Sequence, residues 1–262
     1  MADVISGQEI TGFLSEKAEN FYKVHTENSV GSTNEEVKAL ARKGEREGYV
    51  LVCENQYSGK GRMERKFFSP ENTGIYMSIL LRPDMKPERA LGITTMAAVA
   101  VCRALEEYGV SPQIKWVNDV FVNGRKVCGI LTESAVDGND GNLEYAVLGI
   151  GVNVYEPKDG FPKEIAGVAG AVFKDKTDNL RNRVCAQILN EIFTLYGGLA
   201  ENKHSGEYID RNFVVGKAVN IICNGRERAA TIDGITDSCL LLVTYENGEK
   251  AVLSSGEISL RL

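Results

Sequence analysis

The fold of this chain is decided by the stretch Lys115-Trp-Val-Asn-Asp-Val-Phe-Val-Asn-Gly-Arg-Lys-Val-Cys-Gly-Ile-Leu131. The Asn-Gly pair at 123–124, set between alternating apolar residues, predicts a tight hairpin of two strands because both turn residues must take a positive φ. We expect the first strand to carry the only tryptophan of the chain and to end at Asn118-Asp119. An amide and a carboxylate at that position are suited to orienting a polar ligand.

The second strand of this hairpin begins with a lysine. Strand alternation predicts that Lys126, Cys128 and Ile130 share one face. A lysine at the start of an otherwise apolar strand costs free energy to bury unless an anion binds it. The stretch alone is equally compatible with a surface hairpin and a solvated lysine, so the choice depends on residues upstream.

Residues 57–73 have the composition of a long loop and concentrate positive charge in an acidic chain. Two glycines would let backbone N–H groups approach an anion closely, and four cations stand among them; these residues are Gly59, Gly61, Lys60, Arg62, Arg65 and Lys66. The spacing fits neither a Walker A loop nor a dinucleotide-binding fingerprint. A phosphate-binding loop and a mobile, solvated loop both remain compatible with this segment.

Composition narrows the class of protein. The 262 residues are 43% hydrophobic and 25% charged, as in ordinary globular proteins, and suffice for one large domain and a small one. A net charge of −6 argues against a general nucleic-acid or anionic-membrane surface. We expect no membrane partner, since no apolar run could span a bilayer and the first residues lack the order of a signal peptide.

The cysteine and histidine content narrows the class of protein further. Six cysteines are scattered singly, which predicts buried thiols in a reducing, cytoplasmic protein. With two histidines in the chain, a histidine-based triad or a multi-histidine metal site is nearly excluded.

Taken in order, the chain predicts a polar preface at 1–19, a large domain at 20–212 and a small all-β domain at 213–262. The preface is too short for a winged helix-turn-helix, so we expect no specific DNA binding. Ser32 and Glu35 have the spacing of a capping box and predict a helix that ends at Gly44 or Gly48. The other expected elements are strands at 20–26, 49–54, 74–82 and 143–154, and helices at 88–108 and 178–200. Asn-Gly and Asp-Gly turns break residues 214–262 into the short strands of a small barrel.

Several motifs together resemble those of the biotin protein ligases. The family's Ser-Thr-Asn stands here as Ser32-Thr33-Asn34, and its glycine/arginine loop as residues 59–67. Its Lys-Trp-Pro-Asn-Asp stands as residues 115–119, followed by Lys-x-x-Gly-Ile-Leu at 126–131. A later Gly-x-Asn matches residues 151–153. The resemblance runs from about residue 20 to the end, and the order and spacing of the motifs carry it.

This resemblance implies an α+β fold: a mixed sheet flanked by helices, with a small C-terminal SH3-like β-barrel. It implies a short-form ligase, without a DNA-binding domain, that uses ATP to activate biotin as biotinyl-5'-AMP. The acceptor would be a lysine of the biotin carboxyl carrier protein of a biotin-dependent carboxylase. Mg²⁺ would arrive on ATP, with no metal site of the protein's own, and a homodimer is a possible assembly.

The resemblance also implies roles for single residues. Lys126 would bridge the biotin carboxylate and the α-phosphate, Arg62 would hold phosphate, and Asp119 would orient the incoming lysine. Those implied to bind biotin are Ser32, Thr33, Asn34, Gln56, Gly59, Lys60, Gly61, Arg62, Lys126 and Gly129. Those implied to bind ATP are Arg62, Arg65, Phe67, Asn118, Lys126 and Asn153.

The chemistry of these residue types is consistent with that reaction. Biotin is largely apolar and needs a few directed hydrogen bonds, whereas joining a carboxylate to a phosphate needs cations where charge accumulates. The sequence departs from the family pattern at Lys60, Glu64, Phe67 and Val117, which bears on loop closure and ATP affinity. The alternatives are a lipoate-type ligase, which shares the fold, and a non-catalytic biotin-binding sensor.

Overall fold

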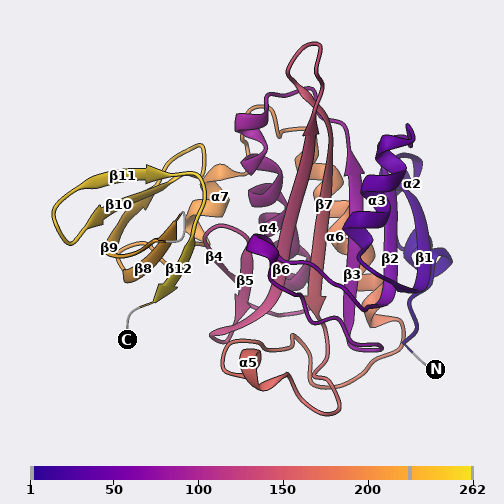
Figure 1. Ribbon diagram of the computed structural model, residues 1–262. Helices are drawn as coiled ribbons and strands as arrows, with labels where there is room; N and C mark the ends of the chain where they lie inside the picture. The colour runs from indigo at the N-terminus through magenta and orange to yellow at the C-terminus, as the bar shows by residue number, and fades with distance from the viewer. Residues whose placement is uncertain (1–2, 224–225, 261–262) are drawn as a thin grey trace.

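A seven-stranded mixed sheet forms the centre of the computed structural model, which describes residues 3–223 and 226–260. The strand order is β1-β2-β3-β7-β6-β5-β4, with β1 and β2 parallel and every other neighbouring pair antiparallel. The strands are β1 (Lys23–Val30), β2 (Tyr49–Gln56), β3 (Gly74–Leu81), β4 (Gln113–Lys115), β5 (Asp119–Val122), β6 (Arg125–Val136) and β7 (Leu143–Asn153). Helices cover the sheet (Figure 1), which confirms the predicted α+β class.

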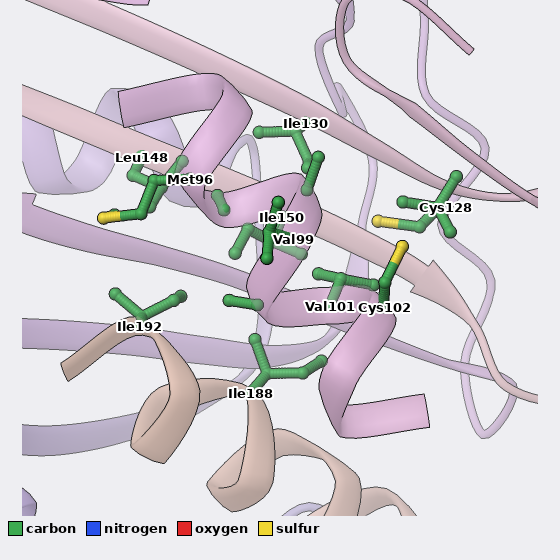
Figure 2. Packing of buried hydrophobic residues seen from close by; sticks show 14 of the residues in the cluster. Met96, Val99, Val101, Cys102, Cys128, Ile130, Leu148, Ile150, Ile188 and Ile192 are labelled. Carbon is green, nitrogen blue, oxygen red and sulfur yellow. The ribbon is translucent and has the colours of Figure 1, made fainter. Parts of the chain in front are cut away.

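One face of the sheet carries the main hydrophobic core. It packs against α4 (Leu91–Glu106) and α6 (Leu180–Tyr196), with α1 (Gly7–Gly12), α2 (Glu16–Phe21) and α7 (Ser205–Asp210) around them. Thirteen of the sixteen residues of α4 are buried, because this helix lies between the sheet and α6 and has almost no solvent-exposed face. Figure 2 shows side chains of α4, α6, β6 and β7 meeting there. This layer buries one whole face of the sheet and leaves the other face for the site.

The opposite face is covered over only part of its area. Helix α3 (Thr33–Arg42) packs Val37 and Ala41 against Leu51, Leu80 and Val147 of the sheet. A long loop with a short 3-10 turn, η1 (Arg62–Glu64), covers the neighbouring region. Between them the centre of this face remains open to a cavity.

The predicted hairpin is present, with one change of register. Asn123 and Gly124 have φ angles of 51° and 72°, as a two-residue turn of this type requires. The strand pairing shifts between Val120 and Phe121, so Phe121 lies opposite Lys126 and Val120 lies opposite Cys128. This bulge overturns the prediction that Lys126 and Cys128 share a face. Cys128 enters the core beside α4, whereas the Lys126 side chain lies on the cavity side.

Two other local expectations are wrong. The tryptophan is not in a strand, because Trp116–Asn118 form a turn between β4 and β5. The predicted capping box is absent: Ser32 is the N-cap of α3 but makes no side-chain capping bond, and Glu35 instead accepts from Lys38.

The N-terminal residues also have more structure than expected. The preface forms α1 and most of α2, so the first strand begins at Lys23 rather than residue 20. Arg181 is fully buried and donates to both carboxylate oxygens of Glu54, at 2.8 and 3.1 Å. Its backbone N–H donates to Asp3, and Ile5 N–H donates to Glu54 at 2.7 Å. One buried arginine therefore ties the N-terminal segment to β2.

The C-terminal unit is a five-stranded antiparallel sheet in the order β11-β10-β9-β8-β12. Its strands are β8 (Ala218–Cys223), β9 (Arg226–Ile235), β10 (Leu241–Tyr245), β11 (Lys250–Leu253) and β12 (Glu257–Leu260). In Figure 1 these strands, coloured from orange to yellow, stand beside β4 and β5, at the opposite end of the molecule from β1. Across the described residues, every helix is too short or too polar to cross a membrane.

The described cysteines are buried as expected. They are Cys53, Cys102, Cys128, Cys185 and Cys239, all free thiols; the side chain of Cys223 lies outside the described residues. Burial raises the pKa of the Cys53 thiol to about 12, so that thiol is protonated at neutral pH.

Candidate functional site

The loop, the start of α3 and the open face of the sheet enclose a cavity of about 440 Å³. Its walls come from β6 and β7, from the segment 161–169 that includes α5 (Lys163–Ala166), and from Ile222, Gly256, Ile258 and Ser259 of the C-terminal unit. Every implied site residue except Gly59 lines it. Residues separated by more than two hundred positions thus meet at one place.

The floor of the cavity is made of strand glycines. Cβ atoms at Gly129 and Gly151 would lie 3.1 and 2.5 Å from ring carbons of Phe67. A Cβ at Gly149 would lie 2.9 Å from Cγ of Asn34. Side chains at these positions would displace the ring and the amide, so the glycines let both lie directly on the sheet. Gly59 acts within the loop, where its carbonyl accepts from Phe67 N–H at 2.9 Å.

One end of the cavity presents small, uncharged polar groups. Thr33 donates from its backbone N–H to Gln56 Oε1 at 2.9 Å, and Gln56 Nε2 donates to Ser69 at 3.0 Å. The hydroxyl of Ser78 lies 2.7 Å from Thr33 Oγ1. Ser32 and Thr33 are almost fully buried. This set offers directed hydrogen bonds without a formal charge.

Asn34 is bound to other protein groups. Its Nδ2 donates to Glu133 at 2.8 Å and to the carbonyl of Leu131 at 3.3 Å, and its Oδ1 accepts from Ser78 at 2.6 Å. Because both N–H groups of the Asn34 amide already donate to protein acceptors, Asn34 shapes the wall rather than offering a free donor. Ser78 was not predicted as a site residue, although a serine inside the apolar strand Gly74–Leu81 is a detectable signal.

Charged groups continue from this wall to the loop. Lys38 bonds Glu133 at 2.7 Å and Glu35 at 2.6 Å, and Lys60 of the loop also pairs with Glu35. The hydrogen bonds from Lys38 and Lys60 lower the pKa of Glu35 from 4.5 to about 2. Lys60 therefore fastens the loop to α3, and its side chain is about half exposed.

The other end of the cavity is cationic. Lys126 Nζ lies 2.7 Å from Asp119 Oδ1 across the hairpin. Arg62 donates to Asn118 Oδ1 at 3.0 Å, and Asn118 Nδ2 donates in turn to the carbonyl of Ile130 at 2.9 Å. Arg65 also lines the cavity. An anion placed here would meet the positive groups of Arg62 and Lys126, and Lys126 would exchange its contact with Asp119 for it.

The segment after β7 supports this end and was not found from sequence. Lys126 N–H donates to Val168 O at 2.8 Å, and Gly170 N–H donates to Lys126 O at 2.9 Å. Asn153 Nδ2 donates to Gly170 O at 3.1 Å, which ties the end of β7 to the same segment. Ile165 and Val168 add an apolar wall. The backbone of Lys126 is therefore held on both sides.

Within residues 3–223 and 226–260, no three acidic, cysteine or histidine side chains gather as a metal site would require. Of the carboxylates that line the cavity, Asp119 is paired with Lys126 and Glu164 is exposed to solvent. A divalent cation would need further ligands, such as the oxygens of a phosphate-bearing substrate.

Comparison with known proteins gives two family matches. Residues 28–153 match the biotin/lipoate A/B protein ligase family, and residues 214–261 match the biotin protein ligase C-terminal domain. A bifunctional ligase/repressor BirA from Bacillus spizizenii is 30% identical over 239 residues, covering 86% of this chain and 70% of that protein. The biotin–[acetyl-CoA-carboxylase] ligase of Mycobacterium tuberculosis is 27% identical, covering 87% and 85%.

Solved structures show the same likeness. The biotin protein ligase of Aquifex aeolicus in complex with biotin and ATP superimposes with a TM-score of 0.74 and 27% identity, covering 92% of this chain and 99% of that one.

Proposed function

The chain belongs to the biotin protein ligases of the biotin/lipoate A/B ligase family, and we propose that its cavity carries out their two steps with the residues described above. The protein is an ATP-dependent biotin ligase, which first joins biotin to AMP and then passes it to a protein lysine. One observation carries the assignment: a single cavity joins an uncharged polar end to a cationic end. Biotin fits the first and the phosphates of ATP fit the second.

The polar end would hold the bicyclic head of biotin. Ser32, Thr33 and Gln56 provide donors and acceptors for a ureido group, and Gly129 lines the same cavity, where it lets the ring of Phe67 lie against the sheet. Asn34 would act by fixing this wall, since its amide is occupied. The ion pairs that run from Glu133 through Lys38 and Glu35 to Lys60 would keep the loop closed over the biotin head.

The cationic end would perform the activation. The biotin carboxylate attacks the α-phosphorus of ATP and an acyl–phosphate bond forms. The phosphoanhydride bond between the α- and β-phosphates breaks, and pyrophosphate leaves with its electron pair. Two anions must approach each other, so catalysis depends on fixed positive charge. Lys126 would exchange its bond to Asp119 for the carboxylate and α-phosphate oxygens, while Arg62 and Arg65 would hold the phosphates. Asn118, Asn153 and the ring of Phe67 would position the nucleotide.

Asp119 would act in the second step. Once Lys126 binds the adenylate, the carboxylate released from it can accept hydrogen bonds from the incoming lysine ammonium and orient its amine toward the acyl carbon. Loss of a proton from the ammonium to Asp119 leaves the free amine, which attacks the acyl carbon. The amide bond forms, the acyl–phosphate bond breaks and AMP leaves with its electron pair, while the second amine proton passes to solvent. We propose the biotin carboxyl carrier protein of a biotin-dependent carboxylase as the acceptor, in keeping with the names of the relatives.

The outer half of β6 is a candidate docking edge for that acceptor. The ladder between β5 and β6 ends at Gly129, while β6 continues to Val136 in pairing with β7. A second cavity of about 420 Å³ lies along this half and also touches Arg62. An extended segment of the acceptor could add to this edge and direct its lysine toward the cationic end. A second copy of the chain could use the same edge to form a homodimer.

We propose that Mg²⁺ enters bound to ATP, as part of the substrate. The protein's own part is then to supply cations for the phosphate charge that the metal leaves exposed. We also propose a cytoplasmic location, since the described cysteines are buried singly as thiols.

Exchange of labelled pyrophosphate into ATP tests the first step. We expect exchange that depends on biotin and that lipoate does not support. Exchange with lipoate in place of biotin would refute the assignment in favour of a lipoate ligase. Absence of exchange with either, in a protein that binds biotin, would identify a sensor.

Arg62→Gly tests the loop as the latch that retains the adenylate. Biotinyl-AMP is a reactive anhydride that must be shielded from water and stray amines. The variant should still form some adenylate but release it, and so label a bystander protein that carries no acceptor sequence. Labelling equal to that by the unmodified protein would show that Arg62 is not the latch.

A further inference from the structure

The turn Trp116–Asn118 joins the C-terminal unit to the cationic end of the cavity. Trp116 is 3% exposed, and its indole Nε1 donates to the carbonyl of Cys239, in the turn between β9 and β10, at 2.9 Å. The two residues lie 123 positions apart in the sequence. This bond connects the turn that precedes β5 to a turn of the C-terminal unit.

Two further hydrogen bonds hold the same turn, one from Tyr208 of α7 and one to Asn212, which follows that helix. The hydroxyl of Tyr208, a fully buried residue, donates to Val117 O at 3.0 Å. The backbone N–H of Trp116 donates to Asn212 Oδ1 at 3.2 Å. Three hydrogen bonds therefore hold the turn, and the partner residue in each of them lies at or beyond residue 208.

Asn118, the last residue of the turn, contacts Arg62 of the loop at residues 57–73. Asn118 is bonded to Ile130 through both its side-chain Nδ2 and its backbone carbonyl, at 2.9 and 3.0 Å. Its remaining side-chain atom, Oδ1, accepts from Arg62 at 3.0 Å. A displacement of the turn would therefore move the acceptor that orients the guanidinium of Arg62.

Cys239 itself has an unfavourable backbone. Its φ is 60°, in the left-handed region that favours glycine or asparagine. Its side chain is only 2% exposed. Such a conformation persists where the surroundings fix it, and here the buried side chain and the bond to Trp116 do so.

We propose that Trp116 is a positioning residue through which the C-terminal unit sets the place of Arg62 on the nucleotide side of the cavity. The inference rests on the proposed ligase function and adds a residue to it. The effect should be much larger for ATP and adenylate than for biotin, because the polar end of the cavity is built mainly from α3, β2 and β3, which the turn does not hold.

Trp116→Phe and Tyr208→Phe test the proposal in the full-length protein. Each keeps a buried aromatic ring and removes one donor, leaving a carbonyl unpaired. We expect the KM for ATP in pyrophosphate exchange to rise about tenfold, the effect of about 1.4 kcal/mol. The KM for biotin should stay within about twofold, and labelling of a bystander protein should increase.

Tyr22→Phe is the matched control. Its hydroxyl is also buried and has no hydrogen-bond partner among the described residues. The substitution should leave both KM values unchanged. A purely structural role for Trp116 would lower the melting temperature while leaving the KM for ATP within about twofold, and that result would overturn the proposal. A parallel rise in both KM values would overturn it as well.

Tyr208→Phe leaves Trp116 as the single tryptophan, so its fluorescence reports on the turn. We expect its emission to shift to longer wavelength in this variant. An unshifted emission together with a raised KM for ATP would refute action through the turn. Exchange by the unmodified protein is measured first: its absence would refute the ligase function, whereas normal exchange with unaltered variants would refute only the role of Trp116.

Discussion

Replacing Lys126 with alanine should nearly abolish adenylation, and removing its counter-ion should then restore part of it. Lys126 Nζ lies 2.7 Å from Asp119 Oδ1, and both side chains are partly exposed at the cavity. A cation about 4 Å from an anion is worth ~4 kcal/mol at an effective dielectric constant near 20. If that interaction forms mainly in the transition state, its loss slows exchange roughly a thousandfold.

Breaking the ion pair slows the reaction by a second electrostatic effect. Without Lys126, the carboxylate of Asp119 faces the incoming anions uncompensated, and at ~6 Å it repels a unit charge by about 3 kcal/mol. Lys126→Ala/Asp119→Asn should therefore exchange pyrophosphate between tenfold and about a hundredfold faster than Lys126→Ala. Asp119→Asn alone should keep most of the exchange but slow transfer to the carrier.

The assay is biotin-dependent pyrophosphate exchange at saturating biotin and ATP, with circular dichroism to confirm folding. Lys250→Ala, an exposed lysine on β11, is the control for loss of a positive charge. If Lys126→Ala retains a tenth or more of the original rate, Lys126 is a bystander. If the double variant is no faster than Lys126→Ala, the repulsion argument is wrong.

Three further outcomes concern the glycine floor, the loop anchor and the buried arginine. Gly151→Ala should push away the aromatic ring that covers it, 2.5 Å from the new Cβ, and raise the KM for ATP roughly tenfold, whereas Gly138→Ala, with open space around it, should not. Glu35 has its pKa lowered to about 2, so its stabilising effect is complete above about pH 4.5 and fades as the pH falls toward 2. Glu35→Gln should flatten the fall in melting temperature across that window, and an unchanged slope would disprove the link. Arg181→Ala should lower the free energy of unfolding by about 3–5 kcal/mol in urea titrations, and an effect no larger than that of exposed Arg183→Ala would contradict it.

Local chemistry made much of the architecture predictable from the amino-acid sequence. The turn at Asn123-Gly124 was correct because a positive φ at two successive residues restricts the residue types strongly. Strand β3 and helix α4 were found because their patterns depend on near neighbours in the chain. The N-terminal helices were missed, since they are short and are held by contacts such as that of Asp3 with Arg181, 178 residues apart.

The candidate site divides in the same way. The sequence by itself determined which residue types were present: the cations of the loop, the lysine of the hairpin and the glycines of β7. The tertiary structure alone decided how the side chains of the site are oriented. A bulge opposite Phe121 turns Lys126 toward the cavity, Ser78 occupies one end of the Asn34 amide, and a carbonyl 123 residues away holds Trp116. Periodicity carries no information about such contacts, because a bulge alters a face by a single residue and a long-range hydrogen bond depends on how whole layers pack.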